Sequence, residues 1–330
     1  MKSNKVSIII KALNEERHIA KCIESSIEAI KQVGGGEVIL VDSISTDKTV
    51  EIAMRYPIKI IQLKHKWMRR CGVGPQIGYL YSRYDYIYVL DGDMTIDKYF
   101  LKKAMPYLDN PEVAGVGGII EEQTLSNILF RKRKRYANVE KVSEVKLLEM
   151  GGLYKRSVIE KVGYLTNPYL YSYEEADFGY RATTIGYKFL RLNVPGVKHW
   201  GKSGSSFKIM IDKFKSKYLM GAGQVLRYNL GTKAFWLHFK ALKIYLWIIF
   251  WWLFGIISLA LSFINDVFIK AYIALTTVGL AILFIKKKKV SEFAFSMFSW
   301  NITALALLIG FFMKKKDPLK YPVNVKIIKK

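Results

Sequence analysis

The sequence has few cysteines, few acidic residues for its length and no recognisable nucleic-acid-binding signature. Cys22 and Cys71 are the two cysteines, and they match neither a zinc-ligand spacing nor a disulfide framework, so a reducing compartment is expected. Only 27 Asp and Glu oppose 52 Lys and Arg in 330 residues, which leaves a net charge of +25. This excess favours an anionic partner, either nucleic acid, acidic lipid or a phosphorylated substrate. No zinc-finger or aromatic RNA-binding pattern supports nucleic acid.

Charged residues are missing from a long run near the end of the chain, at 244–264. Further apolar stretches follow at 267–285, where Lys270 is the only charged residue, and at 293–313. A helix of about 20 apolar residues spans a bilayer, and globular helices rarely need such runs. We therefore predict a transmembrane region at 242–330, with spans near 244–264, 267–285 and 293–313 and a basic tail.

The orientation of these stretches follows from the basic residues between them. The positive-inside rule places the lysine run 286–289 and the basic segment before Ile244 in the cytoplasm. The apolar run at the start of the chain is too short for a signal peptide, which also favours a cytoplasmic amino-terminal part. Three full spans would put the basic tail on the opposite side, against the same rule. Either the rule is overridden or one stretch is interfacial or re-entrant, so two or three spans remain open.

The first 205 residues alternate strand-like and helix-like stretches. Apolar runs at 6–10, 37–41, 58–63 and 86–90 read as strands, and residues 14–33 carry apolar side chains at helical spacing. This alternation predicts an α/β domain with a mostly parallel, Rossmann-like, doubly wound sheet. Ligands bind such sheets beyond the carboxyl ends of the strands. The polar residues Asn14, Asp42, Asp91 and Asp93 fall at those ends.

The stretch Asp91-Gly92-Asp93 follows the last of these strands directly. Two carboxylates this close repel each other unless a positive group lies between them. A divalent cation that also holds phosphate oxygens would fill this position. A polar turn with its bend at Gly92 is the alternative, although the shared edge of the sheet favours the metal.

Four stretches together resemble glycosyltransferase family 2, which has the GT-A fold. They are "VSIIIKALNEERHI", "VILVDSISTDKT", "YVLDGDM" and "YEEADFGYR", in the order of the family, and the resemblance covers roughly residues 5–205. It implies an inverting transferase, a hexosyltransferase that takes a sugar from a UDP- or GDP-linked donor with Mg²⁺ or Mn²⁺. The family pattern implies a nucleotide-sugar site at Ala12, Asn14, Glu15, Asp42, Asp91 and Gly92.

The same resemblance implies metal ligands and a catalytic base. Asp93, with Asp91 nearby, would hold the cation that neutralises the charge of the leaving diphosphate. His199 resembles the histidine that completes the metal site in several GT-A enzymes; otherwise His199 and Trp200 pack under the acceptor site.

In "EEADFGYR" the position of the base falls on Glu175, where the family more often has aspartate, and Asp177 is the second choice. Glu174 and Asp177 are alternatively groups that orient Arg181 or cap a helix.

Between the two halves, residues 206–241 interleave cations with aromatic residues, a pattern typical of helices that lie in the lipid interface. "QVLRY" within this segment is similar to an acceptor-site motif of processive polysaccharide synthases. It makes Gln224, Arg227 and Tyr228 weak candidates for acceptor binding.

The leading hypothesis is thus an inverting, metal-dependent glycosyltransferase at the cell membrane, with its catalytic domain in the cytoplasm. The expected acceptor is a lipid-linked, polyprenyl-type glycan. A polyprenyl (dolichol) phosphate sugar synthase is the second hypothesis and a processive polysaccharide synthase the third. A membrane-anchored scaffold that binds anionic lipid is the non-enzymatic alternative. The donor sugar, the base, the acceptor and the oligomeric state stay open.

Overall fold

The computed structural model describes residues 4–124, 141–149, 151–201 and 204–330. The chain forms two compact units, of which the first comprises Met1–Ser203 together with Lys316–Lys330 and the second comprises Gly204–Lys315. The division expected from sequence kept the tail with the apolar region. In the structure, the last part of the chain instead belongs to the first unit.

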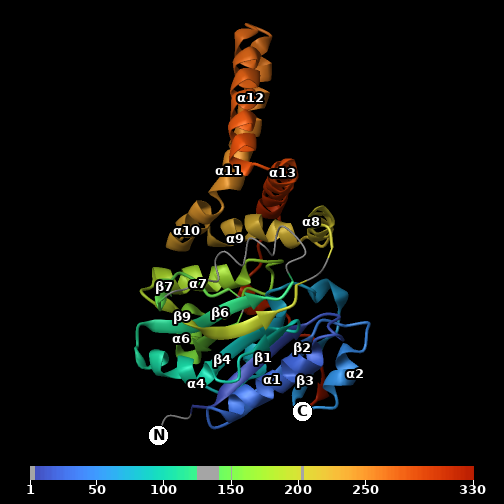
Figure 1. Cartoon of the computed structure of the whole chain (residues 1–330), viewed down its shortest axis with the longest axis vertical. Coiled ribbons are helices and arrows are strands. Elements are labelled where there is room, and N and C mark those ends of the chain that lie inside the picture. The colour runs from blue at the N-terminus through green and yellow to red at the C-terminus, as the bar shows by residue number, and fades with distance from the viewer. Residues whose placement is uncertain (1–3, 125–140, 150, 202–203) are drawn as a thin grey trace. The chain divides into compact units, whose positions relative to one another are not determined.

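The first unit is built around one mixed sheet (Figure 1). Its strands are β1 (Val6–Ala12), β2 (Gly36–Asp42), β3 (Lys59–Leu63), β4 (Tyr86–Asp91), β5 (Met94–Ile96), β6 (Val113–Glu122), β7 (Ser143–Val145), β8 (Gly152–Lys155), β9 (Lys188–His199) and β10 (Val325–Lys329). Its helices are α1 (Ile19–Lys31), α2 (Thr49–Ala53), α3 (Val73–Tyr81), α4 (Phe100–Ala104), α6 (Arg156–Val162) and α7 (Glu174–Thr184). Short 3₁₀ turns lie at Lys66–Met68 and Met105–Asp109.

The order of the strands is β10-β3-β2-β1-β4-β8-β6-β9-β5, and β7 pairs with β9. Pairs β1–β2, β1–β4, β2–β3 and β6–β9 are parallel, whereas β4–β8, β6–β8, β5–β9, β7–β9 and β10–β3 are antiparallel. The α/β prediction and the amino-terminal parallel strands are confirmed. The antiparallel half arises because β8 enters between β4 and β6, a long-range pairing that no local pattern signals.

Burial follows the sequence pattern closely. Strands β1 and β2 are buried along nearly their whole lengths, as expected for parallel strands covered on both faces. Helix α1 turns Ile19, Ile23 and Ile30 into the core, at the spacing of one helical face. Each such side chain contributes about 1.5–3 kcal/mol when fully buried. The parallel strands are thereby held in a fixed register, with their carboxyl ends at one edge.

The end of the chain adds a strand to this sheet. Strand β10 pairs antiparallel with β3, with Val325 opposite Leu63 and Ile327 opposite Ile61. Figure 1 marks the C-terminus beside β3. The tail thus forms an edge strand of the sheet in the first unit.

The second unit is helical. Its helices are α8 (Ser206–Lys215), α9 (Gly221–Asn229), α10 (Lys233–Ala241), α11 (Lys243–Ser262), α12 (Val267–Lys287) and α13 (Val290–Phe312), with a 3₁₀ turn at Tyr218–Met220. Helices α11, α12 and α13 are each long and apolar enough to cross a membrane. They match the three predicted apolar stretches within a few residues.

The three apolar helices differ in how much of them is covered. In the most apolar window, 6% of α11 and none of α12 is buried inside the structure, against 39% of α13. Helix α13 packs closely on α9, because Gly223 faces the carbonyl oxygen of Leu307 and Gly310 faces that of Met220. These glycines let the two backbones touch. Helix α13 is therefore partly an internal element of the second unit.

Candidate active site

The carboxyl ends of β1, β2 and β4 meet at one edge of the sheet, as the sequence predicts. Asn14, which has a left-handed φ of 58°, accepts a hydrogen bond from Thr46 N–H at 2.7 Å. The N–H of Asn14 donates to the Ser45 hydroxyl and that of Glu15 to the Thr49 hydroxyl. These bonds join the loops after β1 and β2 and hold Asn14 and Glu15 at the edge.

Asp42 ends β2 at this edge and is fully buried. Its carboxylate accepts from the N–H of Ser45 at 3.0 Å and from the Gln62 side chain at 2.9 Å. A buried carboxylate needs such donors because it cannot lose its water without compensation. Asp42 therefore organises the β2 loop, and its predicted place in a nucleotide-sugar site stays a prediction.

Asp91 and Asp93 point to different partners. The Asp91 carboxylate lies 3.1 Å from Nζ of Lys11, and the same ammonium lies 2.9 Å from Glu174. Gly92 separates the two aspartates and donates its N–H to the carbonyl of Lys11. A Cβ at Gly92 would come within 2.9 Å of Glu15 Cγ and 3.1 Å of Ala12 Cβ, so β1 and the β4 turn are in close contact here. Lys11 is thus the positive group that the two close carboxylates require on the Asp91 side.

The charges around Lys11 do not balance. Burial alone would lower the pKa of Lys11, but the charges of Asp91, Glu174 and Glu175 raise it well above its usual value. Burial and the Asp93 charge raise the pKa of Asp91, while Lys11 opposes them. One ammonium therefore faces several carboxylates at this edge. The remaining negative potential attracts a further cation.

Asp93 pairs with His199 instead. The Asp93 carboxylate lies 3.5 Å from Nε2 of His199, and Nδ1 of His199 lies 2.8 Å from Glu122. The pairing of β5 with β9 places Met94 opposite His199, and the N–H of Trp200 donates to the carbonyl of Asp93. Strand pairing thus brings His199 to a residue more than a hundred positions earlier in the chain.

Glu122 fixes the orientation of the His199 ring. Its side chain is 1% exposed, so it accepts from Nδ1–H in a nearly dry setting and directs Nε2 toward Asp93. Burial alone would lower the pKa of His199, but the hydrogen bonds and charges of Asp93 and Glu122 raise it to about 9. A carboxylate that binds one nitrogen of a histidine while the other faces a second carboxylate is a common arrangement around divalent metals.

The donor set fits a divalent cation that is shared with a ligand. Asp93 and Nε2 of His199 are close enough to bind one ion together. Among the described residues, no group of three or more His, Cys, Asp or Glu side chains forms a metal site by itself. Ions such as Mg²⁺ commonly take one or two protein carboxylates and complete their shell with phosphate oxygens and water. The geometry therefore suits a metal that arrives with a diphosphate.

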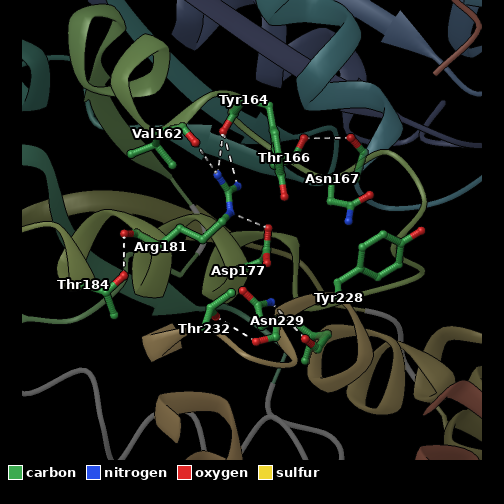
Figure 2. Close-up of polar contacts among 12 residues, drawn as sticks. Val162, Tyr164, Thr166, Asn167, Asp177, Arg181, Thr184, Tyr228, Asn229 and Thr232 are labelled. Carbon is green, nitrogen blue, oxygen red and sulfur yellow. Dashed lines mark hydrogen bonds and ion pairs between the residues drawn. The ribbon is translucent and has the colours of Figure 1, made fainter. Parts of the chain in front are cut away.

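The three acids at the start of α7 have different surroundings, and Asp177 is tied to Arg181. Asp177 is fully buried and lies 2.9 Å from Nε of Arg181, one turn later. Arg181 in turn donates to the carbonyls of Val162 and Tyr164 at 3.3 Å and stacks on the Tyr164 ring (Figure 2). Asp177 and Arg181 thus hold α7 to the preceding loop, which matches the alternative role considered for them.

Glu174 and Glu175 occupy the first turn of α7. Glu174 is buried against Lys11, whereas Glu175 is half-buried. Tyr173 before them has a left-handed φ of 67°, a strained conformation for a residue with a side chain and one that concentrates at functional sites. The structure brings Glu174 and Glu175 to the same edge as Asp91, through Lys11.

Two residues of this site were not predicted. Lys11 is a lone lysine in an apolar strand, next to "ALNE", and this charge in an otherwise buried strand was the sequence signal that could have identified it. Glu122 is the last residue of β6, which ends in "IIEE". The weak acceptor candidates belong to the other unit of the chain. Gln224, Arg227 and Tyr228 lie on α9 in the second unit, where Gln224 is buried and Arg227 faces the Phe311 ring. Their role stays a prediction.

Comparison with known proteins gives one family. Residues 7–182 match the model of glycosyl transferase family 2. A curated relative from Methanococcus voltae, dolichyl N-acetyl-α-D-glucosaminyl phosphate 3-β-D-2,3-diacetamido-2,3-dideoxy-β-D-glucuronosyltransferase, is 30% identical over 133 residues. That match covers 36% of this chain and 40% of the relative. The matched length is thus less than half of either protein.

Solved structures of similar fold extend further along the chain. The mannosyltransferase PcManGT from Pyrobaculum calidifontis, in complex with GDP-Man and Mn²⁺, has a TM-score of 0.60 at 17% identity and covers 94% of this chain and 88% of its own. S. aureus TarS 1–349 in complex with UDP-GlcNAc has a TM-score of 0.50 at 18% identity and covers 66% of each chain. At these identities the likeness establishes the GT-A fold.

Proposed function

Since this chain belongs to glycosyltransferase family 2, we propose that it transfers a sugar from a nucleoside-diphosphate donor to a lipid-linked glycan, with inversion at the reacting carbon. The observation that carries this proposal is the pairing of Asp93 with His199, beside the pairing of Lys11 with Asp91 and Glu174. These groups give one edge of the sheet both metal ligands and acids. The enzyme class follows from the family; the acceptor and the roles of the residues are the proposal.

The donor end of the reaction needs positive charge, because the diphosphate gains negative charge as the bond to the sugar breaks. Asp93 and His199 would hold Mg²⁺ or Mn²⁺, which acts as a Lewis acid on the diphosphate oxygens when bound. Glu122 keeps the His199 ring in position, and Lys11 keeps Asp91 in place beside it. The fixed strand ends pre-organise these groups before the donor arrives.

The acceptor end needs a base, and the burial of the three acids favours Glu175. Asp177 is tied to Arg181, and Glu174 is tied to Lys11. A carboxylate held by a cation in a buried pair is a weak proton acceptor. Glu175 is half-buried and lies in the first turn of α7 at the same edge. It takes the proton from the attacking hydroxyl as the new bond forms.

The acceptor is proposed from the long apolar helices and the need for a base. A catalytic unit tethered to a membrane and an acceptor with a lipid anchor share one surface, which raises their effective concentration. The name of the relative from Methanococcus voltae describes a dolichyl phosphate-linked sugar as its acceptor. A hydroxyl acceptor needs deprotonation, whereas a lipid phosphate is already ionised, so Glu175 favours a lipid-linked glycan over a polyprenyl phosphate. We place the catalytic unit on the cytoplasmic face, because the basic segments flank the apolar helices.

The first test is binding of UDP and of GDP to the purified full-length chain, each with Mn²⁺ and with EDTA. One nucleotide is expected to bind in a Mn²⁺-dependent manner, and Asp93→Ala is expected to abolish that dependence. Transfer is then measured with sugar donors of the bound nucleotide and two acceptors, a polyprenyl phosphate and a polyprenyl-linked sugar. Glu175→Gln should bind the nucleotide as the wild type does but lose transfer. If both nucleotides fail to bind folded protein, the proposed function is wrong.

A further inference from the structure

The chain leaves the first unit after Ser203 and returns to it at Lys316. The return is fixed by several contacts within that unit. Strand β10 is paired with β3, Lys64 N–H donates to the Asn324 carbonyl at 3.1 Å, and Lys329 donates to the carbonyls of Met54 and Tyr56. The Tyr321 ring packs edge-on against Tyr169, with ring centroids 5.1 Å apart. The tail is thus an integral part of the catalytic unit.

We propose that α11 and α12 alone cross the bilayer and that α13 stays on the side of the catalytic unit, with its uncovered face against lipid. A folded unit lies on one side of a membrane. A segment that starts and ends in the same unit must therefore cross an even number of times. Three crossings by α11, α12 and α13 would place β10 on the opposite side of the membrane from β3. They are therefore incompatible with the pairing of β10 and β3.

Exposure identifies the two helices that cross. Helices α11 and α12 are almost uncovered, whereas more than a third of the apolar window of α13 is buried. With 20 and 21 residues, α11 and α12 are each about 30 Å long, the thickness of the hydrocarbon core. They pack on each other through Trp251 and Tyr272, and Trp251 donates to the Thr276 hydroxyl, so they form a hairpin (Figure 1).

Helix α13 has the two faces of a helix that lies along a membrane surface. One face, with Phe295, Ala304, Leu307 and Gly310, is buried. Its other face exposes apolar side chains, including Leu305, Ile309 and Phe312. Helix α13 packs on α9, a helix that carries Arg227. A helix packed against a charged amphipathic partner suits the interface better than the hydrocarbon core.

The basic residues agree with this arrangement. With α11 and α12 as a hairpin, the Lys286–Lys289 run, α13 and the basic tail all lie on the side of the catalytic unit. The turn at Asn265–Asp266 alone reaches the opposite side. The conflict between three spans and the positive-inside rule therefore disappears.

The test is labelling of the full chain with a membrane-impermeant maleimide, in intact cells and after permeabilisation. Three variants are compared, Asp266→Cys, Lys289→Cys and Lys330→Cys. Wild type is the blank, because Cys22 and Cys71 both lie in the catalytic unit. We expect Asp266→Cys to gain label in intact cells, and the other two to gain it only after permeabilisation. The labelling requires no activity, so it can fail or succeed independently of the proposed function.

Each other outcome identifies a different topology and overturns the proposal. Label on Lys330→Cys in intact cells would mean an odd number of crossings. Label on Lys289→Cys would mean that α13 crosses. Protection of Asp266→Cys would mean that α11 and α12 do not form a spanning hairpin.

The strand pairing itself is tested by a disulfide. Leu63 and Val325 are register partners, so Leu63→Cys with Val325→Cys should crosslink when membranes are oxidised. Gln62→Cys with Val325→Cys is the matched control, because adjacent side chains in a strand point to opposite faces. The crosslinked peptide is detected by mass spectrometry. Equal crosslinking of both pairs, or of neither, would remove the basis of the proposal.

Discussion

Glu122→Ala is the variant that most directly tests how the site is built. The Glu122 carboxylate lies 2.8 Å from Nδ1 of His199 and also accepts from the N–H of Thr124 at 3.4 Å. With Glu122 removed, the His199 ring loses the contact that sets its tautomer and its direction. Loss of a carboxylate behind a metal-binding histidine lowers metal affinity by about 10–100-fold, or about 1.4–2.7 kcal/mol. That range also matches the worth of one hydrogen bond to a charged group, about 1.5–3 kcal/mol.

The assay is calorimetric titration of Mn²⁺ into the full chain with the bound nucleotide present. Glu122→Gln should lose less than Glu122→Ala, because its amide oxygen still accepts from Nδ1–H and only the charge is gone. Glu121→Ala is the matched control, since neighbouring side chains in β6 point to opposite faces. Wild-type Mn²⁺ affinity in folded Glu122→Ala would refute the role of Glu122 in positioning His199. So would an equal loss in Glu121→Ala.

Three further predictions concern charge and packing. Lys11→Met should destabilise the protein by about 3–5 kcal/mol, because it leaves the carboxylates of Asp91 and Glu174 without their cation; thermal unfolding measures this, and adding Glu174→Gln should restore part of it. Gly223→Ala should lower the melting temperature, since its Cβ would meet the backbone of α13, while Gly279→Ala on α12 meets nothing and should be neutral or stabilising. Equal effects of the two glycine variants would contradict the packing of α9 on α13. In EDTA, His199 should add stability that is fully present below pH 6.5 and lost as the pH rises through about 9, because its pKa is raised on folding. His199→Gln should lack this component, and parallel pH profiles of melting temperature for the variant and wild type would contradict it.

The sequence carries the elements of the site but not their pairing. Asp42 and the Asp91-Gly92-Asp93 stretch follow recognisable strands, so their place at one edge could be read from local pattern. The partners of the acids at this site could not be predicted from local pattern, because they lie far away in the sequence. Lys11 meets Glu174, and His199 meets Glu122, across more than seventy residues. The register of β5, β6 and β9 brings His199 to Glu122 and Asp93, and register is a property of the whole sheet. The Lys11–Glu174 contact joins β1 to α7 and likewise depends on tertiary packing.

The acids of α7 are a second case in which the sequence does not show which side chains are buried. In "EEADFGYR" the resemblance to the family favours Glu175 as the base and Asp177 as second choice, and all three acids lie in the first turn of the helix. Burial separates them, because Arg181 takes Asp177 and Lys11 takes Glu174. Glu174 and Asp177 are buried and Glu175 is half-buried, a difference that only the tertiary structure reveals; the assignment of the base to Glu175 stays a proposal.

By itself, the sequence determined the α/β class, the family, the edge where the site lies and the three apolar helices. The class, the edge and the apolar helices follow from composition and from short-range periodicity, which depend on neighbours along the chain. The family follows from the resemblance of four short motifs to known members. Which carboxylate faces which cation, and the return of the tail to β3, were decided by the tertiary structure. Both depend on contacts between residues far apart in the chain, and hydropathy contains no term for such contacts. For the same reason hydropathy marks α11, α12 and α13 alike, while the paired tail distinguishes a hairpin from three spans.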